Sequence, residues 1–413
     1  MPLRLSFSAA LTALLTFFSL LGAAQSCLGI ENPAVKYCLV LGYQYIGTAD
    51  SSGNAQGYCR LPDNSLVEAW AFFQGMSGQQ YSYCAGKGLR IETRTRAHPQ
   101  GFTTRRAVCI ADENLPGMKA GTELDLLDLL QSKGKEFIQL SPRQAPLNAV
   151  SPKSEQFNEI PARMLIETFD WRDQDQHSYI GPVRDQGACG DCYAFGAAAA
   201  AETAYNIRHH RYDENTVDFS ESFIAWCLGA YGPYSEHFSG CNGADYEYAE
   251  LDALTREGVT LELNFPYTEE DPGSCTHNND PVHIFSGWGR IPPNDTAGIK
   301  KAIMKYGALD AAIFAPADFI FYSGGLYSDG QTECPDGAWT ETNHAVALVG
   351  WGKDAVTGEY WILRNSWGVG WGENGYMKIA MKAARVACAT AFLQYTPPAY
   401  FPPIPALYLL RKK

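Results

Sequence analysis

The stretch that decides the fold is RDQGACGDCYAF, residues 184–195. Its two cysteines, Cys189 and Cys192, have a C-x-x-C spacing. That spacing suits a redox pair, half of a zinc site, or one structural cysteine beside a reactive one. The residues around the pair, and those far downstream, have to separate these three interpretations.

The residues after Cys192, YAFGAAAAAETAYNIRHH (193–210), are rich in alanine and predict a buried helix of about four turns. Asp191 is a good N-cap residue. Cys192 would then lie in the first turn, where the peptide dipoles favour a thiolate and lower the thiol pKa from about 8.5. The sequence therefore predicts that Cys192 is the reactive cysteine of the pair.

A catalytic cysteine needs a base, and the base needs a group that orients it. The sequence offers His344 in TNHAVALVGWG and Asn365 in EYWILRNSWGVGWGENGYMKI. Residues 344–350 and 359–365 have strand character and flank the turn-like KDAVTG. In an antiparallel hairpin, His344 and Asn365 face each other at its open end. Trp367 could shield their hydrogen bond from water. We therefore expect a Cys-His-Asn triad.

The bulk properties indicate an exported globular protein. The chain has 413 residues, a formal net charge of -13 and 12 cysteines. The negative charge argues against a nucleic-acid partner. Residues 1–26 are typical of a signal peptide, with a membrane anchor as the alternative, and the sequence predicts no span in the mature chain. Seven cysteines from Cys189 onward form an odd set, so one of them should be a free thiol.

Composition divides the remaining chain into four parts. Residues 27–112 are rich in Gly, Tyr and Cys and predict a small disulfide-stapled module with a helix near LVEAWAFFQG. Residues 113–164 are expected to be a connector or pro-like segment, residues 165–395 a compact domain, and residues 396–413 a Pro-rich tail.

The blocks DQGACGDCYAF, NHAVALVGWG and NSWGVGWGENGYMKI resemble the signatures of papain-like cysteine peptidases. FDWRD, CNG and FPY fall in the order of that family. The resemblance implies an α+β fold with a helical left lobe, a β-rich right lobe and an active site between them. ENPAVKYC and the residues of 57–75 resemble a short bacterial module sometimes called hemolysin-like, whose role is not established.

The resemblance also implies the roles of individual residues. Cys192 would be the nucleophile, His344 the general base and acid, Asn365 its orienting group, and Gln186 a donor in the oxyanion hole. The implied disulfides are Cys189–Cys241, Cys227–Cys275 and Cys334–Cys388, which leaves Cys192 free. The implied substrate-binding residues are Gly243, Ala244, Tyr246, Ala312, Ala345, Trp367 and Leu393.

These inferences favour one structural and one reactive cysteine over the other interpretations. No thioredoxin-like strand precedes the C-x-x-C, and the adjacent His209 and His210 cannot both face one metal from a helix. Two departures from the family stand out: Tyr193 where tryptophan is usual, and Ala244 where glycine is usual. The usual helical inhibitory pro-region has no counterpart, and residues 27–164 occupy its place.

We therefore expect a secreted, monomeric cysteine endopeptidase that acts on peptides or proteins and needs no metal or cofactor. Its compartment would be extracellular, periplasmic or lysosomal, depending on the host. Residues 27–164 would restrain it before maturation. A catalytically weak binding or adhesion protein with the same fold is the alternative, because Ala244 narrows the approach of a substrate backbone.

Overall fold

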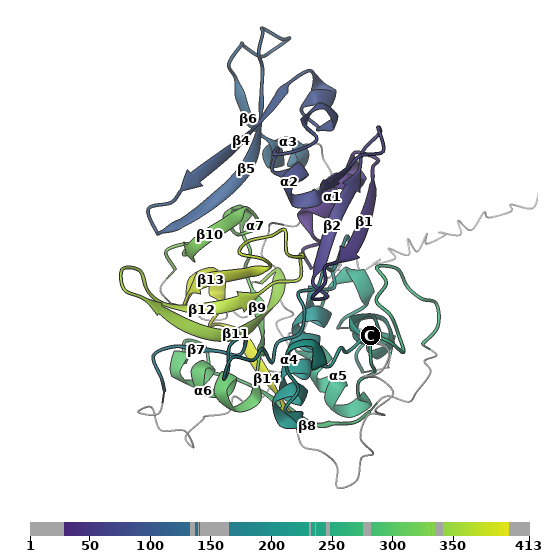
Figure 1. The fold of residues 1–413 in the computed structure, drawn as a ribbon, viewed down its shortest axis with the longest axis vertical. Coiled ribbons are helices and arrows are strands. Elements are labelled where there is room, and N and C mark those ends of the chain that lie inside the picture. Colours follow the sequence, from purple (N-terminus) through teal and green to yellow (C-terminus); the bar gives the residue numbers. More distant parts are fainter. Residues whose placement is uncertain are drawn as a thin grey trace, which may run out of the picture.

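The computed structural model of the chain describes residues 29–132, 137–138, 140, 165–230, 233–235, 237–244, 248–275, 282–331, 333–334 and 342–395. The predicted signal peptide, most of the connector's second half and the Pro-rich tail lie outside the described residues. In Figure 1 the N-terminal elements, coloured purple to blue, lie against a part coloured teal to yellow.

The N-terminal region forms a module with two disulfides, Cys38–Cys59 and Cys84–Cys109. Its elements are α1 (Pro33–Val40), β1 (Gln44–Ala49), β2 (Ala55–Arg60), β3 (Leu66–Glu68), α2 (Ala69–Phe73), β4 (Arg90–Ala97), β5 (Phe102–Ile110), β6 (Glu123–Asp125) and α3 (Leu126–Gln131). Strands β1, β2 and β3 make an antiparallel sheet. The helix expected near residues 66–75 is α2.

The module extends past residue 112, the boundary that composition predicts. Strand β6 pairs with β5, and the buried leucines of α3 belong to the same core. Residues 123–131 are therefore part of the folded module and not of a connector. The first turn of α3 forms because the Asp125 side chain accepts the Leu127 N–H at 2.9 Å.

The rest of the chain forms a helical lobe and a sheet-rich lobe. The helices and strands of these two lobes are β7 (Phe169–Asp170), α4 (Cys192–His209), α5 (Ala249–Glu257), β8 (Phe285–Arg290), α6 (Thr296–Tyr306), β9 (Leu309–Ile313), α7 (Ala317–Ile320), β10 (Tyr322–Tyr327), β11 (His344–Asp354), β12 (Gly358–Arg364), β13 (Tyr376–Ala380) and β14 (Thr390–Tyr395). Figure 1 shows α4 and α5 in the teal part and β9 to β14 in the green to yellow part.

One large sheet joins the module to the sheet-rich lobe. Its strand order is β4-β5-β10-β13-β12-β11-β9-β14-β8, with β5 antiparallel to β10. The two parts also share a hydrophobic core, in which the Phe73 ring stacks on Phe321 at 5.4 Å. Burying a phenylalanine is worth about 1.5–3 kcal/mol, so this junction is a stable one.

Helix α4 carries Cys192 and is buried along most of its length, from Cys192 to Asn206. Alanine has the highest helix propensity, and its small side chain allows the sheet to approach closely. At Gly196 the approach is so close that an added Cβ would collide with the Asp310 carboxylate of β9. The helix ends at His210, whose φ of 50° is left-handed.

Strands β11 and β12 form the predicted hairpin, but with a different register. Ala347 pairs with Arg364, and the pairing shifts at a bulge between Leu348 and Gly350. His344 and Asn365 lie beyond the last ladder pair, at the open end of the hairpin, where their side chains meet at 2.8 Å. The prediction that they face each other there is confirmed, although they are not paired in the ladder. The register differs because the turn joins Asp354 to Gly358, closer to the C-terminus than the predicted midpoint, and the bulge only partly offsets this difference.

Candidate active site

Cys192 lies at the N-terminus of α4, against the first residues of β11. Its side chain is buried, and Sγ accepts a hydrogen bond from the Ala345 N–H at 3.3 Å. Asp191 is the N-cap residue, but its side chain does not cap the helix. It accepts a hydrogen bond from the Tyr267 hydroxyl at 2.9 Å instead. The close contact to Ala345 places the thiol beside His344, the preceding residue.

His344 is held by Asn365 and Trp367. Its Nε2 lies 2.8 Å from Asn365 Oδ1, and because a carbonyl oxygen only accepts, Nε2 carries the proton. The Trp367 ring stacks on the imidazole with centroids 4.7 Å apart and is fully buried. Nδ1 has no hydrogen-bond partner among the described residues. The imidazole therefore keeps one free lone pair, as a general base requires.

Gln186 is fully buried beside Cys189, in the loop before α4. Ser366, which sequence reasoning did not identify, donates its hydroxyl to Gln186 Oε1 at 2.7 Å. This bond directs the amide nitrogen away from Ser366. The nitrogen donates to the backbone oxygens of Cys189 at 2.7 Å and Ile30 at 3.0 Å.

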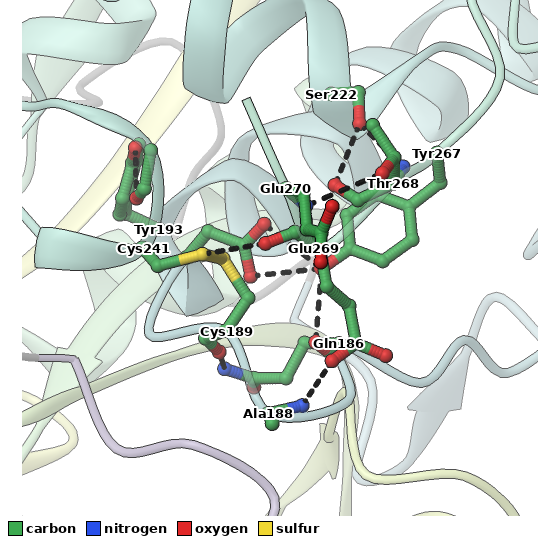
Figure 2. The surroundings of a disulfide bond; sticks show 12 residues. Gln186, Ala188, Cys189, Tyr193, Ser222, Cys241, Tyr267, Thr268, Glu269 and Glu270 are labelled. Atoms are coloured by element: carbon green, nitrogen blue, oxygen red, sulfur yellow. Dashed lines mark hydrogen bonds between the residues drawn. A yellow bond between two sulfur atoms is a disulfide. The ribbon is translucent and has the colours of Figure 1, made fainter. Parts of the chain in front are cut away.

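The structure joins Cys189 to Cys241, so the C-x-x-C cysteines are not bonded to each other. Figure 2 shows this disulfide with Gln186 and Tyr267 nearby. Cys227 bonds to Cys275 and Cys334 to Cys388, which are the pairs that the resemblance implies. Cys192 is the free cysteine among the described residues.

Replacing Cys189 by serine is expected to destabilise the chain by roughly 2–5 kcal/mol, the usual cost of losing a native disulfide. The bond ties the loop before α4 to the 3-10 turn at residues 240–242. Urea unfolding of the variant and the parent would measure the loss. Peptide mapping that joined Cys189 to Cys192 in the parent would contradict this assignment.

Burial makes both reactive groups neutral in this structure. It raises the pKa of the Cys192 thiol to about 12, although the Ala345 N–H opposes the rise. It lowers the pKa of His344 to about 4, although the bond to Asn365 opposes the fall. The helix-end argument predicted a lowered thiol pKa, whereas in this arrangement burial is the largest influence on the thiol and acts in the opposite direction.

This electrostatic state predicts how Cys192 reacts in the full chain. A thiol with a pKa near 12 is ionised in about one molecule in 10⁵ at pH 7. Alkylation of Cys192 by iodoacetamide should therefore be slow and rise about tenfold per pH unit from pH 7 to 9. Glutathione, alkylated in parallel, should level off near its own thiol pKa. A rate for Cys192 that stayed flat from pH 5 to 9 would instead reveal a preformed ion pair.

Four of the predicted substrate-binding residues gather in one apolar cluster. Ala312 of β9 pairs with Ala345 of β11, and both of them, like Ala244, are packed against the hydrophobic core that contains the buried Leu393. Gly243 has a φ of 77°, which favours glycine. Trp367 lies on His344 and outside this cluster, while Tyr246 lies outside the described residues.

Two carboxyl groups that the sequence did not place near this cluster belong to β9 and α5. Asp310 lies two residues from Ala312, on the same face of β9, and Glu250 of α5 is hydrogen-bonded to it. Both are buried, which raises the pKa of Asp310 to about 7 and that of Glu250 as well. Burial therefore favours the neutral form of both carboxyl groups.

The described residues contain no group of three or more His, Cys, Asp or Glu side chains that could hold a metal ion. His209 does not belong to such a group, and its Nε2 lies 2.6 Å from the Tyr395 hydroxyl.

Among the described residues, no helix is both long and apolar enough to cross a membrane.

Comparison with known proteins decides the family. Residues 165–396 match the model of the papain family of cysteine proteases. The chain belongs to this family. Residues 29–76 match a second model, a domain of unknown function (DUF333). The papain-family domain thus carries Cys192, His344, Asn365 and Gln186, and the DUF333 module precedes it.

Relatives within the papain family are moderately similar. Cysteine proteinase 2 of Entamoeba histolytica is 36% identical over 230 residues, which are 54% of this chain and 66% of the relative. Fruit bromelain of Ananas comosus is 31% identical over 247 residues, 59% of this chain and 64% of the relative. The chain thus spans less than two thirds of either relative.

The fold agrees with that of solved papain-family precursors. Procathepsin L 3 from the larval midgut of Tenebrio molitor has a TM-score of 0.50 and 27% sequence identity. The match covers 62% of this chain and 76% of that chain. The α+β fold with two lobes, predicted from the sequence motifs, is confirmed.

Proposed function

We propose that the chain is a cysteine endopeptidase that cleaves peptide bonds through Cys192, His344 and Asn365. One arrangement carries the proposal: His344 Nε2 is bonded to Asn365 Oδ1, while the neighbouring Ala345 N–H contacts Cys192 Sγ. It supplies a nucleophile, a base with a free nitrogen and an orienting group.

In the proposed reaction, the proton of the Cys192 thiol moves to Nδ1 of His344 as sulfur attacks the peptide carbonyl carbon. The developing oxyanion receives hydrogen bonds from the Gln186 side-chain amide and the Cys192 backbone N–H. His344 then gives its proton to the departing amine, and the C–N bond breaks to leave a thioester. Water, deprotonated by His344, attacks the thioester and releases the acid together with free Cys192.

An assay of peptide hydrolysis with and without a thiol alkylator tests the proposal. Hydrolysis that disappears as Cys192 becomes alkylated supports a cysteine peptidase. A binding or adhesion protein, the alternative expected from Ala244, would bind peptides but not cleave them, even with Cys192 exposed and unmodified.

Export is part of the same proposal. The disulfides of both parts fit an oxidising compartment, because cytosolic thiols are kept reduced. We propose that peptides or proteins outside the cytosol are the substrates.

The apolar cluster predicts the preferred side chain two residues before the cleaved bond. Ala312, Ala345 and Leu393 offer apolar contact, and burial favours the neutral form of Asp310 and Glu250 at acidic pH. A Phe-Arg reporter should therefore be cleaved with a specificity constant at least about tenfold above that of Arg-Arg at pH 5.5, since an unpaired buried Arg is costly. The ratio should shrink as the pH rises past 7. Equal constants at pH 5.5 would show that a carboxylate pairs with the Arg.

A further inference from the structure

The first described residues of the N-terminal module, Gly29 to Asn32, run across the candidate active site. Ile30 and Asn32 are both almost completely buried there. Ile30 precedes Gln186 by 156 residues, so the hydrogen bond between them is a tertiary contact. We call residues 29–32 the strap.

The strap occupies the hydrogen-bonding groups that a substrate would need. The Ile30 carbonyl accepts the Gln186 side-chain amide at 3.0 Å, the donor proposed for the oxyanion hole. The other amide hydrogen of Gln186 is directed to the Cys189 carbonyl at 2.7 Å. The Ile30 N–H donates to the Asn343 carbonyl, next to His344, at 3.2 Å. A substrate carbonyl could reach Gln186 only after Ile30 had left.

Gly29 lies directly against the nucleophile. A Cβ built on Gly29 would lie 2.9 Å from Cys192 Sγ and would collide with the Gly190 backbone oxygen. No side chain fits at this position while the strap is in place. The strap therefore covers the sulfur, in keeping with the burial of Cys192.

Asn32 anchors the strap on the other side of the site. Its side-chain amide donates to Asp185 at 2.8 Å and to the Trp367 carbonyl at 3.3 Å, while its Oδ1 caps α1 by accepting the Ala34 N–H at 3.0 Å. Its backbone N–H donates to the Gly187 carbonyl at 2.9 Å.

The body of the module reinforces this anchor. The Tyr45 hydroxyl donates to Asp185 at 2.5 Å, and Trp70 donates to the Trp367 carbonyl at 3.0 Å. The strap is thus bound on the loop before α4 and on the segment that follows Asn365.

We propose that the N-terminal module (residues 29–131, of which 29–76 match DUF333) inhibits the papain-family domain in cis, with the strap bound in the cleft in place of a substrate. That the module is an inhibitor rests on the proposed peptidase function, whereas the contacts of the strap do not depend on that function. Because β5 and β10 share a sheet and Phe73 packs on Phe321, the module stays attached while the strap alone moves out. Residue 29 then controls access to the nucleophile.

The test compares two Gly→Ala variants of the full chain. Gly29→Ala adds a methyl group where Cys192 and Gly190 leave no room. Gly86→Ala adds the same group to the same module where nothing lies within 4 Å, and neither glycine has a positive φ. Each chain is treated with iodoacetamide at pH 7, and alkylated Cys192 is quantified by peptide mapping. Hydrolysis of a Phe-Arg reporter is measured in parallel.

Gly29→Ala should increase the rate of Cys192 alkylation at least tenfold, while Gly86→Ala should match the parent. Asn32→Ser, which can still cap α1 but cannot span both Asp185 and Trp367, should give a smaller increase. Unchanged alkylation in both Gly29→Ala and Asn32→Ser would overturn the proposal, and so would a parent chain alkylated as fast as Gly29→Ala. Faster alkylation without any reporter hydrolysis would support the strap and reject the peptidase function.

Discussion

Replacing Cys192 by alanine is expected to abolish peptide hydrolysis, with a loss of at least about 10⁴-fold in kcat. A thioester needs a thiol, and Cys192 carries the free thiol in the described part of the chain. Alanine fills the same small space at the start of α4 without burying a new polar atom, so the fold should persist. The loss is measured in the Gly29→Ala background, where the strap no longer covers residue 192.

Two controls separate this loss from unfolding. Circular dichroism and the thermal midpoint of the Cys192→Ala variant should match those of its parent. Substantial hydrolysis by the folded variant would contradict the mechanism, because another residue would then have to be the nucleophile.

Replacing His344 by alanine should cost nearly as much as removing Cys192, because nucleophile and base act as a unit. Among the described groups beside Cys192, the unpaired Nδ1 of His344 is the atom that can act as the base, because Nε2 is hydrogen-bonded to Asn365. The variant in the Gly29→Ala background should lose at least about 10³-fold in kcat near neutral pH. It should also lose the increase in Cys192 alkylation that Gly29→Ala produces at pH 7.

Asn365→Ala serves as the graded comparison for His344→Ala. It removes the acceptor for Nε2 but keeps the imidazole and its stacking on Trp367. A smaller loss than that of His344→Ala is expected. If Asn365→Ala were as inactive as His344→Ala while remaining folded, Asn365 would have to do more than orient the imidazole.

The local chain features were predictable from the sequence because short-range patterns determine them. The alanine-rich run gave α4, and the strand patterns on either side of KDAVTG gave the hairpin. The family motifs pointed to Cys192, His344, Asn365 and Gln186, and the structure brings these residues together. Asn343 and Ser366 stand inside the same motifs, but their roles depend on backbone and hydroxyl contacts that residue type alone does not indicate.

The contacts between distant segments were not predictable. The pairing of β5 with β10 joins strands more than 200 residues apart, as the Tyr322–Thr104 pair shows. The pKa directions of Cys192 and His344 follow from the same kind of contact: Gly29 of the strap covers the thiol, and the Trp367 ring covers the imidazole. Nothing in the sequence around Gly29 distinguishes it from an ordinary loop glycine, since its role depends on the two atoms that it meets at residues 190 and 192.

Trapping the covalent intermediate tests the central claim most directly. The Gly29→Ala chain is mixed with a p-nitrophenyl ester of an N-blocked phenylalanine, quenched in acid within milliseconds to seconds, and analysed by intact mass and peptide mapping. The account predicts one acyl group per chain, attached to Cys192, which accumulates in a burst and disappears as the ester is consumed. An acyl group on any other residue, or steady turnover with no adduct on Cys192, would contradict it.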